Sequence, residues 1–185
     1  MAAAAAPGLP ELDGSALQPL GPEHHPLMER LNSATPEGIA ELPAAAERYL
    51  EHLKDLRGRP WSLATVCKQD GKESGYCQLS VGQFKNLAAY VVGLFLDPGR
   101  AAPVLSLYIR QAFWSHPLHR LYTHVPITPD TTPYRRLYEQ AGFIPEGTLI
   151  GHALVGGEER DVAVLGLLRE DFDAWCQAHD PRLAL

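Results

Sequence analysis

The chain of 185 residues is long enough for one domain with a sizeable hydrophobic core, because single domains usually hold about 100 to 200 residues. Hydrophobic residues make up 45% of it and charged residues 21%, a composition that excludes a chain disordered over its whole length. With 22 acidic and 16 basic residues the net charge is −6. The chain therefore lacks the broad positive field that draws proteins non-specifically to nucleic acids or anionic membranes.

Residues 1–15 are rich in Ala, Pro and Gly, and we expect a flexible leader there, followed by a single domain over residues 16–185. The leader lacks the positive charge of a secretory signal, and no apolar stretch approaches the roughly 18 residues of a membrane span. The cysteines, Cys67, Cys77 and Cys176, form neither a C-x-x-C pair nor an even set, which disfavours a disulfide framework or a zinc site. We therefore expect a cytoplasmic protein with no membrane partner, in which Cys67 and Cys77 are core residues.

The first part of the chain predicts a strand, two helices and a β-hairpin. These elements are the strand Ala16–Leu20, the helices His24–Asn32 and Leu42–Leu56, and the strands Trp61–Cys67 and Tyr76–Val81. The second helix is amphipathic, because apolar residues recur in it at three- and four-residue spacing, and Gly58 ends it. Asp70–Gly71 is a typical hairpin turn between the two strands.

Residues 87–96 read LAAYVVGLFL and are apolar on both faces, which indicates a central strand covered by helices on both sides. Pro103 suits the first turn of a helix, and the apolar face that follows predicts a helix over Ala102–Trp114. The next strand is expected at His119–Val125. Because a crossover helix joins these two strands, we predict that they are parallel.

The last part predicts a short helix, a hairpin and a final helix. They are the helix Pro133–Ala141, the strands Thr148–Val155 and Asp161–Leu168, and a helix that starts near Glu170. The complete order is β-α-α-β-β-β-α-β-α-β-β-α. This order predicts an α/β fold of the α+β kind, with a central mixed sheet flanked by helices on both faces.

The segment 134–143, YRRLYEQAGF, resembles a helix of the GNAT superfamily of N-acyltransferases, in the branch similar to ribosomal-protein N-terminal acetyltransferases. In that branch the helix ends in Leu-Tyr-x-x-x-Gly-Phe, which Leu137, Tyr138, Gly142 and Phe143 match. The element order is also that of the family, so the resemblance covers almost the whole chain after the leader. It implies a GNAT-like fold and an N-acyltransferase that moves an acyl group, typically acetyl, from a thioester such as acetyl-CoA or another acyl-CoA to a primary amine.

The resemblance implies that Tyr138 is the general acid that protonates the departing thiolate, since a phenol with a pKa near ~10 keeps its proton at neutral pH. Helical spacing alone places Tyr138 on one face with Tyr134 and Leu137, which is equally consistent with simple packing. The reaction also needs a base for the amine. His124, at the end of the fifth predicted strand with Tyr122 on the same face, is the candidate, and a partly exposed histidine without a role is the alternative.

The resemblance places the acyl donor along the fourth strand and the loop that follows it. A backbone amide among Leu94, Phe95 and Leu96 would polarise the thioester carbonyl. In the family, the N–H groups of an Arg/Gln-x-x-Gly-x-Gly/Ala loop cradle the pyrophosphate of the donor. The donor-binding positions of this loop would be Arg100, Ala101, Ala102 and Val104.

This loop reads DPGRAAPVL and departs from the family pattern, since Ala101, Ala102 and Pro103 replace the later glycines. Proline has no N–H, and β-carbons restrict the approach of a phosphate. Thr131 also stands where the family commonly has asparagine, and Tyr134 replaces a small residue. These changes point to a different donor, such as a carrier-protein thioester or an aminoacyl-tRNA, or to no donor; the acidic net charge disfavours tRNA and other nucleic acids.

The resemblance places the acceptor between the first two helices, where Asn32, Glu37 and Glu41 would contact a cationic amine. A solvated charged face is the alternative for these residues. We expect a small-molecule or peptide amine as acceptor and no metal; a carrier protein and a second copy in a homodimer are further partners that the sequence leaves open. The alternative function is a GNAT-like binding or regulatory protein that has lost its pyrophosphate loop and holds a partner in the groove.

Overall fold

The computed structural model describes residues 14–40, 42–43, 45–59, 62–83 and 87–184. The described residues form one seven-stranded sheet in the order β1-β2-β3-β4-β5-β7-β6. Its strands are β1 (Ser15–Pro19), β2 (Leu63–Gln69), β3 (Lys72–Gln83), β4 (Ala88–Phe95), β5 (Arg120–Pro126), β6 (Ile144–Val155) and β7 (Glu158–Leu168). The helices are α1 (His25–Ala34), α2 (Ala46–Gly58), α3 (Ala102–Ser115), α4 (Thr132–Gln140) and α5 (Arg169–His179).

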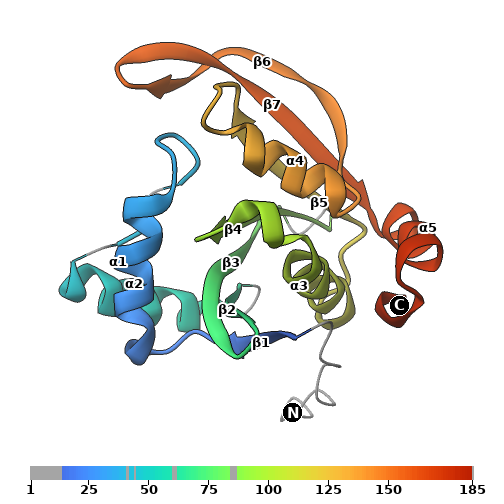
Figure 1. The fold of residues 1–185 in the computed structure, drawn as a ribbon, viewed down its shortest axis with the longest axis horizontal. Coiled ribbons are helices and arrows are strands. Elements are labelled where there is room, and N and C mark those ends of the chain that lie inside the picture. Colours follow the sequence, from blue (N-terminus) through green and yellow to red (C-terminus); the bar gives the residue numbers. More distant parts are fainter. Residues whose placement is uncertain (1–13, 41, 44, 60–61, 84–86, 185) are drawn as a thin grey trace.

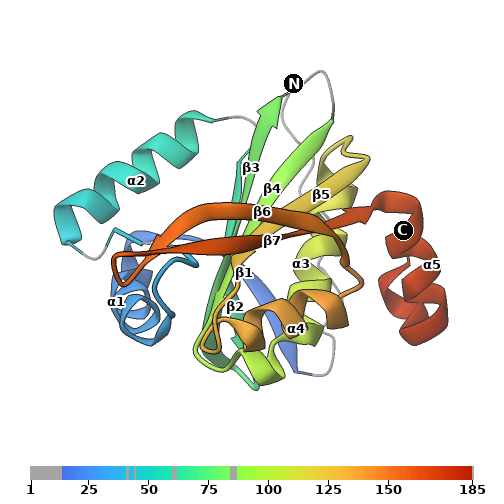
Figure 2. The same cartoon turned by 90° about the horizontal axis from the view of Figure 1, so that it is seen from above.

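The helices form layers on the two faces of the sheet, as the element order predicts. Figure 2 shows α1 and α2 on one side and α3 with α4 on the other, while α5 lies beyond the end of β7. The long hairpin of β6 and β7 curves over the body as an arm (Figure 1). The predicted α/β architecture and the predicted order of elements are confirmed.

Three predicted element starts are wrong by four residues each. One is that of β3, which begins at Lys72 rather than at Tyr76. The second helix begins at Ala46 rather than at Leu42. Leu42 is a buried residue, but it belongs to the linker that precedes the helix. β6 begins at Ile144 rather than at Thr148, because Ile144 pairs with Gly166 of β7. Most of β6 is exposed on both faces, so the start of this strand carries no apolar alternation from which it could be predicted.

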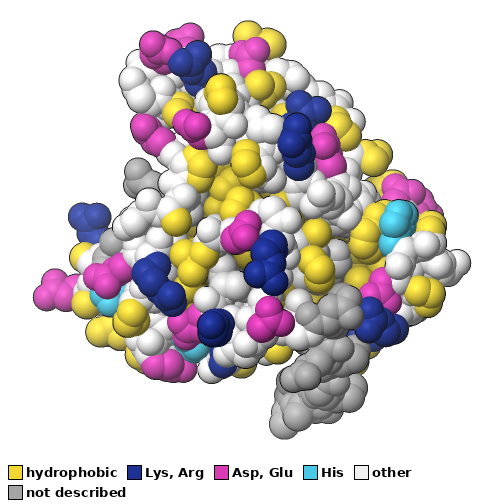
Figure 3. Space-filling view, viewed as in Figure 1, with side chains coloured by type: hydrophobic (Ala, Val, Ile, Leu, Met, Phe, Trp, Pro, Cys, Tyr) yellow, Lys and Arg dark blue, Asp and Glu magenta, His cyan; other side chains and the backbone are white. Residues whose placement is uncertain are grey.

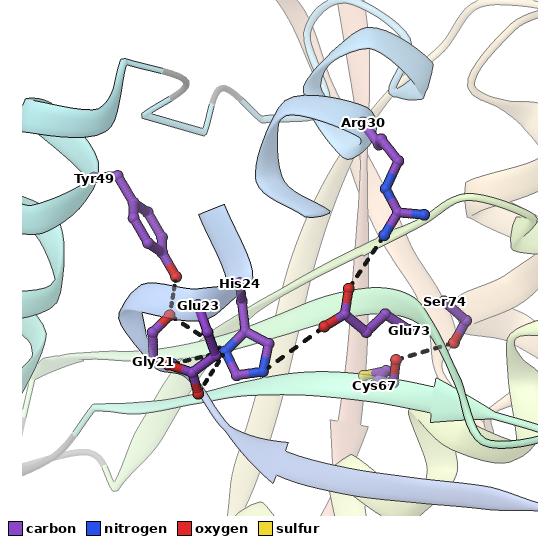
Figure 4. A network of polar contacts seen from close by, with 8 residues as sticks. All are labelled: Gly21, Glu23, His24, Arg30, Tyr49, Cys67, Glu73 and Ser74. Atoms are coloured by element: carbon purple, nitrogen blue, oxygen red, sulfur yellow. Dashed lines mark hydrogen bonds and ion pairs between the residues drawn. The ribbon is translucent and has the colours of Figure 1, made fainter. Parts of the chain in front are cut away.

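The start of α1 is held by a network of polar contacts (Figure 4). The Gly21 amide donates to Nδ1 of the buried His24 at 2.9 Å, and the Tyr49 hydroxyl donates to the Gly21 carbonyl at 2.6 Å. Arg30 of α1 forms an ion pair with Glu73 of β3 at 3.1 Å. These contacts fix α1 both to α2 and to the sheet.

β4 and β5 are parallel, as predicted, but they pair only at their amino-terminal ends. The ladder runs from Ala88 with Arg120 to Tyr90 with Tyr122. β4 continues to Phe95 with β3 as its partner on the other side, and β5 remains paired with β7 throughout. The two strands therefore separate after Tyr90, and we call the wedge between them the β4–β5 splay.

Candidate active site

The splay leaves the edge of β4 without a partner among the described strands, and two tyrosines of α4 occupy that edge. The Tyr138 hydroxyl accepts a hydrogen bond from the Gly93 amide at 2.8 Å. The Tyr134 hydroxyl accepts a hydrogen bond from the Phe95 amide at 3.4 Å and donates one to the Phe95 carbonyl at 3.2 Å. The backbone groups that a β5 partner would satisfy are thus satisfied by phenols.

The spacing of these residues explains why a helix can take the place of a strand. Tyr134 and Tyr138 are four residues apart on α4, which is a rise of about 6 Å. Gly93 and Phe95 are two residues apart on β4, which is about 6.6 Å. Successive phenols on one helix face therefore meet successive edge amides of the strand.

Tyr138 forms part of the wall of the splay, with only 3% of its surface exposed. Burial raises the pKa of this phenol far above its ordinary range, and the neighbouring Cys77 adds to the rise. Hydrogen bonds from the Thr123 hydroxyl and the Gly93 amide act in the opposite direction, because they favour the phenolate. Tyr138 is therefore a protonated group whose anion, once formed, is held by two donors.

Tyr90 is the last residue of β4 that pairs with β5, so it lies where the splay begins. Burial raises the pKa of Tyr90, while hydrogen bonds from the backbone of His124 and the side chain of Thr123 lower it. Thr123 is buried and also lowers the pKa of Tyr138, and its single hydroxyl proton is donated to one of the two phenols at a time. Its hydroxyl therefore lies between the two phenols, and the polar groups of the splay are connected.

His124 belongs to an aromatic cluster beside the splay. Its ring centroid lies 5.4 Å from that of Tyr90, 5.9 Å from that of Tyr122 and 6.4 Å from that of His152. The predicted neighbourhood of His124 and Tyr122 is confirmed. Burial, and secondarily the charge of His152, lowers the pKa of His124, so its imidazole is neutral at pH 7 and able to accept a proton.

His152 is a member of this cluster that the sequence did not identify. It lies on β6, where the pairing with β7 jumps from Leu149 to Ala153. Gly151 has φ +57° at this irregularity, and such bulges redirect the side chains that follow. The glycine in a predicted strand is the signal that was available.

The predicted amide donors on β4 need a correction. Leu94 pairs with Tyr76 of β3, and the Leu96 amide donates to the Ser74 carbonyl at 2.9 Å. Both face β3, because the edge groups of successive strand residues alternate in direction. Of the three predicted residues only Phe95 presents its amide to the splay. Gly93, which is not among the predicted residues, does so as well. A glycine within the apolar run 87–96 was the signal for Gly93.

The loop between β4 and α3 satisfies its own backbone. The Gly99 amide donates to the Asp97 carboxylate at 3.0 Å, the Arg100 amide to the Asp97 carbonyl at 3.2 Å, and the Ala101 amide to the Pro98 carbonyl at 3.4 Å. Pro103 has no N–H to offer. The N–H groups of Gly99, Arg100 and Ala101 are therefore not free for the predicted diphosphate cradle.

Arg100 of this loop contacts residues of the β2–β3 hairpin through both its side chain and its backbone. The Arg100 guanidinium lies 3.5 Å from Asp70, and the Arg100 carbonyl accepts the Gln69 side chain at 2.7 Å. Ala101 and Val104 are fully buried, and Ala102 is the first residue of α3. The loop is thus tied to the β2–β3 hairpin.

Two of the predicted acceptor residues hold the segment that follows α1. Asn32 accepts the Leu42 amide at 3.2 Å, and Glu37 accepts the Gly156 amide at the tip of the arm at 2.9 Å. Glu37 also lines a cavity of about 310 Å³, whose wall includes Asp130 and Arg160. Glu41 lies outside the described residues.

The surface near the splay is hollowed and apolar. Figure 3 shows hydrophobic side chains gathered between the arm with α4 on one side and the body around α1 and β4 on the other. Within the described residues, no group of three His, Cys, Asp or Glu side chains is placed to hold a metal ion. No described helix is both long and apolar enough to cross a membrane.

No protein-family model matches the chain, but solved structures resemble it over most of its length. RimJ from Mycobacterium smegmatis, in complex with CoA-disulfide, is 21% identical, with a TM-score of 0.69 over 85% of this chain and 83% of that one. A variant of the spermidine N-acetyltransferase SpeG from Vibrio cholerae is 18% identical, with a TM-score of 0.72 over 86% and 96%. A dodecameric structure of spermidine N-acetyltransferase from the same organism is 17% identical, with a TM-score of 0.70 over 90% and 99%. The chain therefore has the GNAT fold that the sequence resemblance implied.

Proposed function

We propose that the chain is an N-acyltransferase that moves an acyl group, in the simplest case acetyl, from a thioester donor to a primary amine. The observation that carries this proposal is the β4–β5 splay, in which the Tyr138 hydroxyl meets the Gly93 amide at 2.8 Å. A phenol beside strand-edge amides supplies an acid and hydrogen-bond donors within one buried site. The likeness to spermidine N-acetyltransferase supports the reaction class as a fold-level analogy.

In this reaction the amine nitrogen attacks the thioester carbonyl carbon, and the carbon–sulfur bond breaks. His124 takes the proton that the amine loses, and Tyr138 gives its proton to the sulfur. The Gly93 amide stabilises the developing oxyanion as the Tyr138 hydroxyl turns from it towards the sulfur. The imidazole of His124 then returns the proton to Tyr138. The Thr123 hydroxyl lies between the two sides of the splay and connects their polar groups.

The state of the loop supports a donor that binds mainly through its acyl-thioester arm. The amides of Gly99, Arg100 and Ala101 are all used within the loop, so a nucleotide diphosphate gains little there. An acyl-CoA and a carrier-protein thioester carry the same arm, and both remain candidate donors. Of the predicted donor residues, Phe95 is the one whose backbone faces the splay.

The cavity beside Glu37 is the proposed acceptor site. Glu37 and Asp130 outnumber Arg160 in its lining, and the net negative charge favours a cationic amine before it loses its proton. The acceptor is then a small-molecule or peptide amine. Asn32 has a structural contact with Leu42, and a role for it in acceptor binding stays a prediction.

A thiol-release assay tests the proposal. The full chain is incubated with acetyl-CoA or acetyl-pantetheine and a panel of amines that includes spermidine and short peptides with free amino termini. Cys67, Cys77 and Cys176 are free and buried, so the protein adds little background to a thiol reagent. We expect release that depends on the amine; folded protein that releases no thiol with any pair contradicts acyl transfer.

A binding protein is the second candidate, favoured by one observation. Every backbone group just described on the β4 edge and in the loop already has a partner within the chain. Thermal stability with excess coenzyme A ligands separates the candidates, because a ligand at about 100 times its Kd adds about 2.7 kcal/mol. Stabilisation without acyl transfer supports the binding protein.

A further inference from the structure

We propose that Tyr134 is a gate on the donor site: its hydroxyl holds the backbone of Phe95 in the free protein, and a thioester donor must displace it to bind. This inference rests on the proposed function. Tyr134 is 1% exposed and projects from α4 onto the edge of β4. It acts on the position of the donor and does not take part in the chemical step.

The first argument is the use of both polar groups of Phe95 by one hydroxyl. Tyr134 accepts from the Phe95 amide and donates to the Phe95 carbonyl. An amide in an extended chain presents the same pair of functions to a strand edge, one donor and one acceptor. The phenol therefore occupies the place of an incoming amide.

The second argument is the chemistry of the donor arm. The acyl-bearing arm common to acyl-CoA and carrier-protein thioesters contains secondary amides in a flexible chain. The edge of β4 beyond Tyr90 is the unpaired strand edge in the splay, and an extended amide chain adds to such an edge. Phe95 cannot bind this arm and Tyr134 at once, since each needs the same N–H and C=O.

The third argument is the difference between the two tyrosines. The contacts of Tyr134 are long, at 3.4 and 3.2 Å, whereas that of Tyr138 is 2.8 Å. Backbone N–H donors prefer about 2.9 to 3.0 Å, so the Tyr134 contacts are the weaker pair. Tyr134 is thus the phenol that gives way first, when the donor binds.

The experiment compares Tyr134→Phe with the matched control Tyr108→Phe. Tyr108 is also fully buried and donates a hydrogen bond to a backbone carbonyl, that of Leu63 at 2.7 Å. The Kd values of acetyl-CoA and acetyl-pantetheine are measured by calorimetry with each full-length protein. Removing the Tyr134 hydroxyl frees two groups for the donor, and we expect about 5- to 10-fold tighter binding. Tyr108→Phe should leave the Kd within about twofold of the wild type.

Hydrogen exchange at the Phe95 amide gives a second readout that needs no turnover. In Tyr134→Phe this amide should exchange faster without donor and become protected when donor is added. In the wild type it should be protected in both states. If Tyr134→Phe fails to fold, Tyr134→Leu serves for the same two measurements.

The outcomes separate the gate from the proposed function. Equal or weaker donor binding in the folded Tyr134 variant overturns the gate, while binding and turnover by the wild type keep acyl transfer standing. Donor binding to neither protein overturns both. Tighter binding in Tyr134→Phe, with protection of Phe95 by the donor and no change in Tyr108→Phe, supports the gate.

Discussion

The Tyr138 hydroxyl accepts the hydrogen of the Gly93 amide at 2.8 Å, across 45 residues of sequence. This bond attaches α4 to the edge of β4 at the point where β5 has moved away. The same oxygen is therefore a structural partner of the sheet and the proposed acid. A substitution at Tyr138 affects both, so each experiment on the site needs a control for stability.

We expect Tyr138→Phe to lower the rate of acyl transfer by about 100-fold or more, because positioned acid catalysis typically contributes that factor. Loss of the hydrogen bond to Gly93 should cost about 1 kcal/mol of unfolding free energy. Steady-state rates and the thermal midpoint are measured on the same preparation. Tyr108→Phe, which loses a comparable buried bond, is the control, and equal rates in the two variants would return Tyr138 to the hydrophobic core.

Gly93→Ala should destabilise the protein by about 1 to 3 kcal/mol, in the range of overpacked cores. An added Cβ would lie 2.9 Å from the Phe95 ring, 3.4 Å from the Tyr138 hydroxyl and 3.5 Å from the Cys77 sulfur. Gly147→Ala is the control, since a Cβ there meets nothing within 4 Å. Urea unfolding of both variants checks the prediction, and a Gly93 variant as stable as the control contradicts the close packing.

The fold was predictable because its signals are local. The apolar run 87–96, the helix predicted over Ala102–Trp114 and the crossover rule together give the parallel pair of β4 and β5. In the structure, pairing between these two strands stops after Tyr90. Which backbone groups of β4 are left without a strand partner depends on the register of the strands. The sequence pattern does not determine this register.

The contacts of Tyr134 and Tyr138 show this difference. Helical periodicity places both on one face of α4, and the structure confirms that both are buried. The contacts of their hydroxyls with Gly93 and Phe95 depend on where α4 packs along β4. This position is set by the tertiary structure and not by helical periodicity. The self-satisfied loop was harder still to foresee, because the Asp97 side chain that accepts the Gly99 amide is an ordinary capping residue in sequence.

The imidazole of His124 should titrate below the ordinary value near ~6.5, because burial and the charge of His152 lower its pKa. The folded state then holds fewer protons than the unfolded state in this range, so this group favours folding above about pH 6.5, and its contribution is lost as the pH falls through the folded pKa. An NMR titration of the ring measures the value. A pKa at or above 6.5 contradicts the buried placement of the ring.

His152→Ala should raise the pKa of His124, because it removes a neighbouring charge of the same sign. If His124 is the base, the acidic limb of the pH–rate profile moves to higher pH in this variant and is absent in His124→Asn. His119→Ala, which changes a histidine outside the aromatic cluster, is the control. A profile that is the same in all three variants removes His124 from the reaction.

Acetyl-CoA and acetyl-pantetheine should bind with Kd values within about threefold of each other, because the loop offers no free N–H at Gly99, Arg100 or Ala101. Arg100→Ala should change neither value by more than about twofold, since the exposed guanidinium faces Asp70 and such surface pairs are weak. Calorimetry with both ligands measures this. Acetyl-CoA bound ten times more tightly than acetyl-pantetheine would show that the loop opens for the diphosphate.

Arg169→Lys should lower the unfolding free energy by about 2 kcal/mol, or the thermal midpoint by roughly 4 to 8 °C. The guanidinium donates to the carbonyls of Phe113, His116 and Leu118 at the end of α3, and an ammonium cannot reproduce this planar fork. Arg135→Lys, in an exposed ion pair with Glu139, is the control and should cost less than about 0.5 kcal/mol.

The affinity of the Arg169→Lys variant for the donor can also be measured. Arg169 lies at the carboxyl end of α3, whereas the donor loop lies at its amino end. Below the unfolding transition the Arg169→Lys variant should therefore bind acetyl-pantetheine like the wild type, since additivity holds for sites without shared partners. A weaker affinity in the folded variant would show that α3 transmits a displacement from its anchored end to the splay, and the two ends would then have to be treated as one coupled unit.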